Sequence, residues 1–202
     1  MTNKRSLAKQ ETRQKLLATA KEMLILNGLL PLSTVEIARQ AGVAHGTLFF
    51  HFQSKENLLV EVIDQELLQI TTELYPLLER PHQLRELLDT YLNFLEREEL
   101  FFAVIARETP FYTPELRRSI LGREAAVRQY FYRAIETAVQ SGQIQPLDIT
   151  SSLNFLFGTL TYYLSLGEAF ASRGCVIAEK RASITETWMK IFEEAPKKGA
   201  GA

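Results

Sequence analysis

Three histidines and one cysteine are the side chains of this sequence best suited to catalysis or metal binding: His45, His51, His82 and Cys175. They form no catalytic or metal-ligand pattern, because neither a Ser-His-Asp order nor an H-E-x-x-H spacing is present. Cys175 has no second cysteine with which to form a disulfide or a cysteine-based metal site. We therefore expect no enzyme, no metal and no cofactor. The chemistry open to His45 and His51, which lie close together, is hydrogen bonding to a polar partner.

The stretch around these two histidines has the pattern of two short helices joined by a tight turn. Ser33, followed three residues later by Glu36, is a capping box that predicts a helix over 34–40. Gly42 follows where the chain must turn through a positive φ, and a second helix is predicted over 44–52. Two helices with a short, glycine-containing turn form a helix-turn-helix, whose second helix enters the major groove of DNA.

This stretch resembles the DNA-binding domain of the TetR/AcrR repressors, whose pattern around the turn is roughly T-x-x-x-I-A-x-x-A-G-V-S-x-G-T-L-Y-x-H-F-x-S-K-E-x-L. The matching residues are Thr34, Ile37, Ala38, Ala41, Gly42, Val43, Gly46, Thr47, Leu48, His51, Phe52, Ser54, Lys55, Glu56 and Leu58. Two positions depart from the pattern. Ala44 replaces the serine that usually caps the second helix, which removes a cap worth about 1 kcal/mol. Phe49 replaces the usual tyrosine, so a hydroxyl that would reach a phosphate oxygen is missing.

The helix-turn-helix pattern and the resemblance together nominate the residues that contact DNA. They are Ser33, Thr34, Ala44, His45, Gly46, Thr47, Phe49, Phe50, His51 and Lys55. We expect His45, at the exposed start of the second helix, to contact base edges and His51 to contact a phosphate. Thr47 would bond a phosphate or pack on a thymine methyl group, and the two phenylalanines would contact thymine methyl groups or simply lie on the surface. Lys55 is either a phosphate contact or a solvated lysine.

The composition is that of an ordinary protein with enough apolar residues, 46% of 202, to bury a sizeable core. Residues 1–60 carry eight basic and four acidic side chains, although the whole chain has a net charge of −1. Positive charge is thus concentrated where phosphate contacts are expected, although such an excess is also common on solvated surfaces. No apolar run approaches the roughly 20 residues that span a bilayer, and the first residues lack the apolar segment of a secretory signal. We expect no membrane association and a cytoplasmic location.

The pattern of the rest of the chain is helical, so we predict an all-α protein of about nine helices. Residues 1–7 are predicted to be a basic arm, either frayed or following a DNA groove, before a helix over 8–26. The helices expected after the turn motif span 54–78, 82–98, 100–108, 114–141, 148–171 and 176–194. We divide the chain into a three-helix DNA-binding domain (1–53), a helical ligand-binding and dimerisation domain (54–195) and a disordered tail (196–202).

The predicted helix over 148–171 is apolar around its whole circumference, so it must be buried on all sides. In TetR-like proteins the last two helices pair with their symmetry mates. A two-fold dimer would also present two DNA-binding helices to the half-sites of an inverted repeat in double-stranded DNA, about 34 Å or more apart. The alternative is that both helices belong to the core of one chain. The residues expected in the interface of a homodimer are Phe157, Gly158, Tyr162, Ile184, Trp188 and Ile191.

Aromatic residues are frequent in the C-terminal part of the sequence. Such residues more often fill a core than line a pocket, but the family resemblance implies a ligand cavity among these helices. We expect a hydrophobic small-molecule effector, bulky or aromatic, to bind there. The candidate pocket residues are Phe102, Arg107, Glu108, Tyr112, Tyr130, Asn154, Phe155 and Tyr163.

Together these features predict a dimeric, ligand-responsive repressor. The helix over 54–78 would act as a lever, because ligand binding would favour a spacing of the DNA-binding domains that no longer matches adjacent major grooves. Two alternatives stay open. One is a constitutive DNA-binding protein with a filled core, and the other is a helical interaction module without ligand control, in which the turn motif no longer binds DNA.

Overall fold

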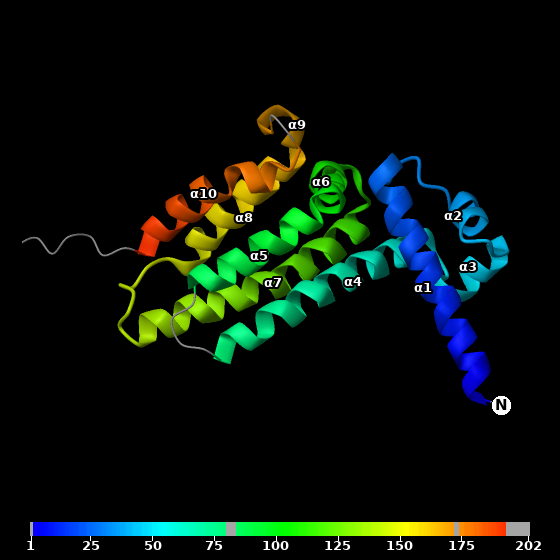
Figure 1. Cartoon of the computed structure of the whole chain (residues 1–202), viewed down its shortest axis with the longest axis horizontal. Helices are drawn as coiled ribbons and strands as arrows, with labels where there is room; N and C mark the ends of the chain where they lie inside the picture. Colours follow the sequence, from blue (N-terminus) through cyan, green and yellow to red (C-terminus); the bar gives the residue numbers. More distant parts are fainter. Residues whose placement is uncertain (1, 80–83, 172–173, 193–202) are drawn as a thin grey trace, which may run out of the picture.

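The computed structural model describes residues 2–79, 84–171 and 174–192, and these residues form helices and connecting turns (Figure 1). The α-helices are α1 (Thr2–Asn27), α2 (Thr34–Gln40), α3 (His45–Phe52), α4 (Lys55–Leu74), α5 (Leu84–Arg97), α6 (Glu99–Glu108), α7 (Pro114–Gln140), α8 (Ile149–Ser165), α9 (Gly167–Phe170) and α10 (Val176–Met189). Short 3-10 helices are η1 (Tyr75–Glu79), η2 (Thr109–Phe111) and η3 (Lys190–Phe192). The predicted all-α class is confirmed. Within the described residues, α9 is the only α-helix as short as a single turn.

The helices α1, α2 and α3 pack into a small bundle at one end of the molecule (Figure 1). Its interior consists of apolar residues at helical spacing, including the fully buried Leu16, Leu24, Ile37 and Leu48. Gly42 has a φ of 65°, the left-handed conformation that lets the chain leave α2 and turn into α3. Packing in the bundle therefore fixes the position of α3, the second helix of the predicted helix-turn-helix.

Several helix ends differ from the sequence-based expectations; α4 ends at Leu74 and α10 at Met189, and both continue as short 3-10 helices. α1 begins at Thr2, so residues 2–7, predicted as an arm, are helical. Neither proline nor glycine occurs between residues 2 and 27, so no residue in this stretch interrupts the helix before it reaches Thr2. α8 ends at Ser165 rather than 171, because Leu166 leaves the helical conformation with a φ of −123° and a ψ of 26°. The start of the helix predicted over 82–98 and the predicted tail lie outside the described residues.

The predicted capping box at the start of α2 is not formed. Ser33 does occupy the cap position, with extended backbone angles, but its side chain makes no capping hydrogen bond. The Glu36 carboxylate instead accepts hydrogen bonds from Arg39 Nε at 2.8 Å and from Gln40 Nε2 at 3.1 Å. Neighbours one turn further along the helix thus compete successfully for the carboxylate, and the hydroxyl of Ser33 stays exposed to solvent.

The buried apolar residues form two clusters. The first core combines α1, α2 and α3 with the first half of α4, with α6 and with the first turns of α7. The second core combines the second half of α4 with α5, the rest of α7, α8 and α10. Leu67 and Phe102 pack against both cores. The packing boundary therefore does not follow the predicted domain boundary at residue 53, since α6 shares its core with the bundle of α1, α2 and α3.

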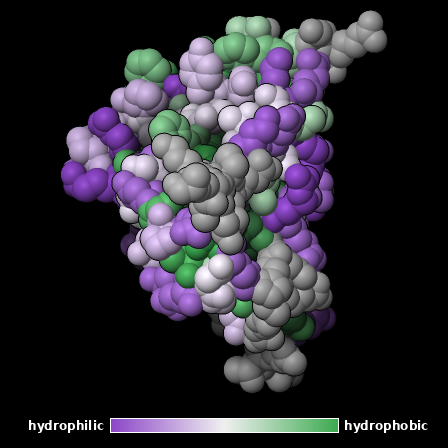
Figure 2. All heavy atoms as spheres, turned by 90° about the vertical axis from the view of Figure 1, so that its left-hand side faces the viewer, coloured by the Kyte–Doolittle hydropathy of each residue, from purple (hydrophilic) through white to green (hydrophobic). Residues whose placement is uncertain are grey.

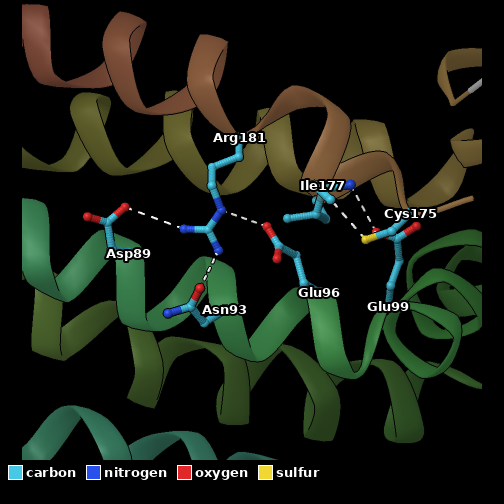
Figure 3. A network of polar contacts seen from close by, with 8 residues as sticks. Asp89, Asn93, Glu96, Glu99, Cys175, Ile177 and Arg181 are labelled. Carbon is cyan, nitrogen blue, oxygen red and sulfur yellow. Dashed lines mark hydrogen bonds and ion pairs between the residues drawn. The ribbon is translucent and has the colours of Figure 1, made fainter.

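One arginine ties the middle of α10 to α5 (Figure 3). Arg181 donates hydrogen bonds to Glu96 Oε1 and to Asn93 Oδ1, both at 2.6 Å, and forms an ion pair with Asp89 at 3.4 Å. The three acceptors come from successive turns of α5. The guanidinium thus bridges a stretch of α5 to a single point of α10.

A carboxylate holds the N-terminus of α10 against α6. Glu99 accepts hydrogen bonds from the backbone N–H of Val176 at 2.7 Å and of Ile177 at 2.9 Å, and from the Cys175 thiol at 2.6 Å (Figure 3). A negative charge at this end of a helix is favourable, because the first N–H groups have no acceptor within the helix. Burial, and then the neighbouring Glu99, raise the pKa of Cys175 to about 11, so the thiol remains a protonated donor.

The end of the molecule farthest from α1, α2 and α3 is hollowed. Figure 2 shows this end, where hydrophobic side chains are visible between hydrophilic ones. A cleft of about 770 Å³ lies there between η1, α5, α7 and the end of α10, with Leu84, Arg85, Arg133 and Phe192 among its lining residues. Among the described residues, no helix combines the length and the apolar character needed to span a membrane.

Candidate DNA-binding surface and ligand cavity

The predicted recognition helix α3 turns its apolar side inward and leaves the other side free. Leu48 and Phe52 are buried in the first core, whereas Phe50 is 69% exposed and Phe49 is 39% exposed. Gly46 is exposed, and a Cβ atom at its position would meet no atom within 4 Å. An exposed, convex helix side with large apolar groups and a glycine fits the contour of a major groove.

The start of α2 lies against the start of α3. Thr34 Oγ1 is 3.0 Å from His45 Nε2, so the first residues of the two helices share a hydrogen bond. The His45 ring also stacks edge-on with Phe49, with 4.9 Å between ring centroids. Ser33 and Ala44, which directly precede α2 and α3, are exposed as well.

Two basic residues of α1 support the far end of α3. Arg13 donates a hydrogen bond to the backbone carbonyl of His51 at 3.2 Å, and its guanidinium lies 4.5 Å from the centre of the Phe52 ring. Lys9 Nζ lies 4.9 Å from the centre of the Phe50 ring. Burial, and then the charges of Arg13 and Lys9, lower the pKa of His51. Arg13 is also ion-paired with Glu61, so within the described part of the chain the exposed ammonium of Lys9 is the free positive charge of this pair beside α3.

Lys55 is the one DNA-contact candidate whose side chain the structure directs into the protein. Its ammonium donates a hydrogen bond to the carbonyl of Leu29 at 3.0 Å, and burial lowers the pKa of Lys55. Lys55 nevertheless directly follows Ser54, whose hydroxyl caps α4 by accepting from the Asn57 N–H at 3.1 Å. The predicted phosphate contact of Lys55 stays a prediction, because two of its three ammonium protons are left for other acceptors.

A cavity of about 250 Å³ lies along the seam between the two cores, and we call it the seam cavity. Its walls are Phe102, Ile105 and Ala106 of α6; Ile63 and Leu67 of α4; Tyr91 and Leu95 of α5; Ile120, Leu121, Glu124 and Val127 of α7; Phe157, Leu160, Thr161 and Leu164 of α8; and Thr109 and Pro110 of η2. Glu124 is the only charged residue in this lining, and its carboxylate accepts from Arg128 Nε at 3.3 Å. An apolar site with few polar groups suits a hydrophobic ligand.

Of the predicted pocket residues, Phe102 lines the seam cavity and the others do not. Glu108 is directed away from the cavity, toward the turn after α1, where it accepts from the Leu29 N–H at 2.7 Å. Tyr112 is buried in the first core, and Arg107 is exposed. The packing of α6 against α1 thus decides which α6 side chains face the cavity, and the ligand contacts predicted for these residues stay a prediction.

The remaining predicted pocket residues lie elsewhere on the second core. Asn154 and Phe155 are on the exposed side of α8, and Phe155 is 69% exposed. Tyr163 packs against the Phe170 ring with 5.3 Å between centroids, and Tyr130 packs against the outside of the second core. On α8 the cavity is instead reached by Phe157 and by residues one turn further along.

The outer faces of α8 and α10 form an exposed apolar groove. It is about 370 Å³ in volume and is lined by Phe155, Leu156, Thr159, Tyr163, Ser183, Ile184, Thr187, Trp188 and Ile191. Tyr162 and Ile191 are exposed, and a Cβ atom at Gly158 would meet nothing within 4 Å. α8 is therefore not buried on all sides within one chain, contrary to the expectation from its composition.

Three residues predicted for the dimer interface, Phe157, Ile184 and Trp188, belong to the core of the single chain. Phe157 is buried and stacks edge-on against Phe131, with 5.5 Å between ring centroids. Trp188 is buried as well, and its indole N–H donates to the backbone carbonyl of Ser152 at 3.1 Å. Trp188 still forms part of the floor of the groove, together with Ile184, whereas Phe157 faces the seam cavity.

The sequence-based search missed Lys9 and Arg13 as partners of α3. Their spacing of four residues places both on one side of α1, which is a usable signal for a basic stripe beside the recognition helix. It also missed Ala106 and Glu124 as cavity residues, for which the sequence carries no comparable signal.

The fold and the exposed α3 surface define a helix-turn-helix regulator, and comparison with known families assigns the chain to one of them. Residues 16–62 match the model described as bacterial regulatory proteins of the tetR family. Residues 79–164 match the tetracyclin repressor-like C-terminal domain. The chain belongs to the TetR family of DNA-binding transcriptional regulators, as the resemblance in the turn motif implied, and its relatives are regulators rather than enzymes.

Named relatives agree with this assignment. The fatty acid metabolism regulator protein of Bacillus subtilis is 24% identical over 146 residues, which cover 70% of this chain and 75% of that protein. The regulator QacR of Staphylococcus aureus is 39% identical over 54 residues, which cover 27% of this chain and only 29% of QacR.

Solved structures share the fold. FadR from Bacillus subtilis in complex with stearoyl-CoA superimposes with a TM-score of 0.76 at 22% identity, covering 87% of this chain and 96% of that chain. PfmR from Thermus thermophilus, a TetR family regulator, superimposes with a TM-score of 0.70 at 18% identity, covering 89% of this chain and 99% of that chain.

Proposed function

We propose that this regulator is a homodimer that represses transcription from an inverted-repeat operator and is released by a hydrophobic small-molecule effector. The observation that carries the proposal is the place of the seam cavity. It contacts the core that holds α3 and the core that holds α8 and α10 at the same time. A ligand in this cavity would change the position of α3 relative to α8 and α10, the helices proposed to form the dimer. The cleft at the end of the molecule farthest from α1, α2 and α3 is larger, but it contacts the second core alone.

The proposed effector carries a long acyl chain. The seam cavity is lined almost entirely by hydrocarbon side chains, and FadR from Bacillus subtilis, which has the same fold, was solved with stearoyl-CoA. At about 250 Å³ the cavity is smaller than the roughly 300 to 1,000 Å³ of typical ligand sites. Binding such a chain must therefore widen the seam, and widening favours a different arrangement of the two cores.

The first test is to select bound duplexes from a random DNA pool at near-physiological salt and to sequence them. We expect an enriched inverted repeat, since a two-fold dimer presents two copies of α3. Enrichment of a single half-site would contradict the dimer, and salt-sensitive binding without enrichment would contradict sequence-specific repression.

The second test measures the affinity for the selected duplex with and without stearoyl-CoA, with coenzyme A alone as the control. Coupling of 1 to 3 kcal/mol corresponds to an affinity loss of about 5- to 150-fold. By reciprocity, the duplex must weaken stearoyl-CoA binding by the same factor. Unchanged operator affinity at saturating stearoyl-CoA would exclude this effector class.

A further inference from the structure

The backbone of Leu29 joins three elements of the first core. Its N–H donates to Glu108 Oε2 at 2.7 Å, and its carbonyl accepts from Lys55 Nζ at 3.0 Å. Glu108 is the last residue of α6, Lys55 is the first residue of α4, and Leu29 lies in the turn after α1. Both hydrogen bonds involve a charged partner in a partly buried place, where such bonds are stronger than neutral ones.

The contact between Glu108 and this turn leaves little freedom. Gly28 has a φ of 77°, and a Cβ atom at its position would collide with the Glu108 carboxylate. The Leu29 side chain is buried in the first core, and only 13% of the Glu108 side chain is exposed. A displacement of the end of α6 must therefore displace the turn as well.

The start of α6 is anchored to α1 in the same way. Lys21 of α1 forms ion pairs at 2.7 Å with Glu98, next to the start of α6, and with Glu66 of α4. Its ammonium also lies 5.6 Å from the centre of the Phe101 ring of α6. Charged contacts thus hold both ends of α6 against α1 and the turn that follows it.

The two charged partners of Leu29 lie next to the two functional regions. Ala106, a wall of the seam cavity, is two residues before Glu108 on α6. Lys55 is three residues after Phe52, the last residue of α3. One path from the cavity to the recognition helix thus runs through the backbone N–H and carbonyl of Leu29.

We propose that Glu108 and Lys55 are positioning residues that transmit occupancy of the seam cavity to α3 through the backbone N–H and carbonyl of Leu29. The inference rests on the proposed function in one respect, that the seam cavity is the effector site. It assigns part of the signal to α6 and the turn after α1, in addition to the lever α4. It also gives a common role to two side chains: the Lys55 ammonium, which is directed into the protein, and the Glu108 carboxylate, which is directed away from the cavity.

The test loads the cavity without any ligand. Ala106→Trp places an indole ring in the seam cavity from α6 itself, and it is made in four backgrounds: wild type, Glu108→Ala, Glu108→Gln and Lys55→Met. Glu115→Ala, which removes an exposed carboxylate paired with Arg118, is the matched control background. Amide hydrogen exchange of Leu29 and of residues 45–52 is measured on each full-length protein, with thermal unfolding as a check of folding. Affinity for the selected duplex is the second readout.

In the wild-type and Glu115→Ala backgrounds, Ala106→Trp should raise exchange in residues 45–52 and lower duplex affinity by about fivefold or more, within the usual range of coupling between sites. In the Glu108→Ala and Lys55→Met backgrounds both effects should shrink to less than twofold. Glu108→Gln should restore part of them, because its amide oxygen still accepts from the Leu29 N–H.

Equal effects of Ala106→Trp in all backgrounds would overturn the inference, because the signal would then bypass Leu29. The absence of any effect in the wild-type background would overturn it as well. A protein that shows the exchange pattern but ignores stearoyl-CoA would contradict the proposed effector alone. A protein that shows it but selects no duplex would contradict the proposed operator alone.

Discussion

At the scale of single residues, α3 shows which of its side chains the protein itself needs. Leu48 and Phe52 complete the first core, while Phe49 and Phe50 remain exposed next to two histidines. An exposed phenylalanine contributes little to folding, and its apolar surface is left for a partner. The departure from the family pattern at Phe49 places a second apolar ring, rather than a hydroxyl, on the predicted DNA-binding surface.

Phe50→Ala should weaken binding to the selected operator by about 1 to 2 kcal/mol, a five- to thirtyfold loss, if its ring packs on thymine methyl groups. The free energy of unfolding should change by less than about 0.5 kcal/mol, because the ring is mostly in solvent. Fluorescence anisotropy and urea unfolding measure the two effects. Leu26→Ala, an exposed leucine at the end of α1, is the control and should change neither. A large loss of stability in Phe50→Ala would show that the ring is structural.

His51 should make operator affinity depend on pH. Burial, and then Arg13 and Lys9, lower its pKa in the free protein below the usual 6.5, and a bound phosphate would raise it again. The complex then binds more protons than the free protein, so affinity should rise as pH falls from about 7.5 to 6, by at most tenfold per pH unit for one proton. His51→Gln should flatten the profile and His45→Gln should not. A flat wild-type profile would rule out the phosphate contact.

The same shift in pKa has the opposite consequence for folding. Because the pKa of His51 is lower in the folded than in the unfolded protein, its contribution to stability is present above about 6.5 and is lost as pH falls through the folded value. Acid therefore weakens the free protein at this residue while it strengthens DNA binding, and the two effects can be separated by measuring both.

At the scale of elements, α10 is held by polar contacts at its start and in its middle, while its apolar side packs on the second core. The first N–H groups of a helix have no acceptor within the helix, and Glu99 provides one for α10. Arg181 connects α10 to α5 (Figure 3). The carboxylate and the helix end are far apart in the sequence. The contact therefore reports on tertiary packing and not on local capping.

Glu99→Ala should lower the free energy of unfolding by about 2 kcal/mol, because two backbone N–H groups and a thiol lose a charged acceptor. Glu99→Gln should cost less, since its amide oxygen can still accept. Urea unfolding compares both with Glu115→Ala, an exposed carboxylate whose loss should cost less than about 0.5 kcal/mol. A Glu99→Ala protein as stable as the control would show that water replaces the carboxylate.

Cys175 should be a slow nucleophile in spite of its place at a helix N-terminus. With a pKa of about 11, its thiolate fraction near neutral pH is roughly a hundredfold or more below that of a free cysteine, and alkylation should be slower by a similar factor. Glu99→Gln should speed the reaction, because it removes the negative charge and leaves the burial. Mass spectrometry after timed exposure to iodoacetamide measures the rate. Alkylation at the rate of a free thiol would mean that the hydrogen bond to Glu99 is not maintained.

At the scale of the whole molecule, the groove on α8 and α10 is an apolar surface that one chain leaves uncovered. Its exposed residues lie opposite the side of α8 that reaches the seam cavity, so one helix serves the cavity with one face and offers the other to solvent. A second copy of the chain covering this groove would bury α8 on all sides, as its composition suggests. It would also let a second chain approach Gly158 closely.

Phe155→Asp should convert the proposed dimer to monomers without unfolding them, because the side chain is 69% exposed in the single chain. Sedimentation velocity measures the change in mass and circular dichroism the retained helix content. Operator affinity should fall by about 100-fold or more, since two linked half-site contacts become one. Leu68→Asp, an equally exposed leucine on α4, is the control and should leave the mass unchanged. A wild-type protein that sediments as a monomer at micromolar concentration would contradict the dimer.

Sequence alone was sufficient for the features that depend on neighbours along the chain. The helix-turn-helix follows from the apolar spacing around Gly42, and the Ser54 cap of α4 from a hydroxyl three residues before a free N–H. The all-α class and most helix bounds follow from periodicity for the same reason. One local prediction was wrong. The Glu36 carboxylate bonds to Arg39 and Gln40, which lie within one turn, and the predicted capping box does not form.

Tertiary structure decided which side of each helix faces what. The composition of α8 marked it as apolar all round, but only its packing shows that Phe157 faces the cavity and Phe155 the surface. Sequence patterns placed Glu108 in the ligand pocket, but its carboxylate accepts a hydrogen bond from the N–H of Leu29, which is 79 positions away. Such contacts join residues far apart in the sequence, and no local propensity specifies them. They follow from how whole helices pack, which is a property of the assembled cores rather than of any stretch of the chain.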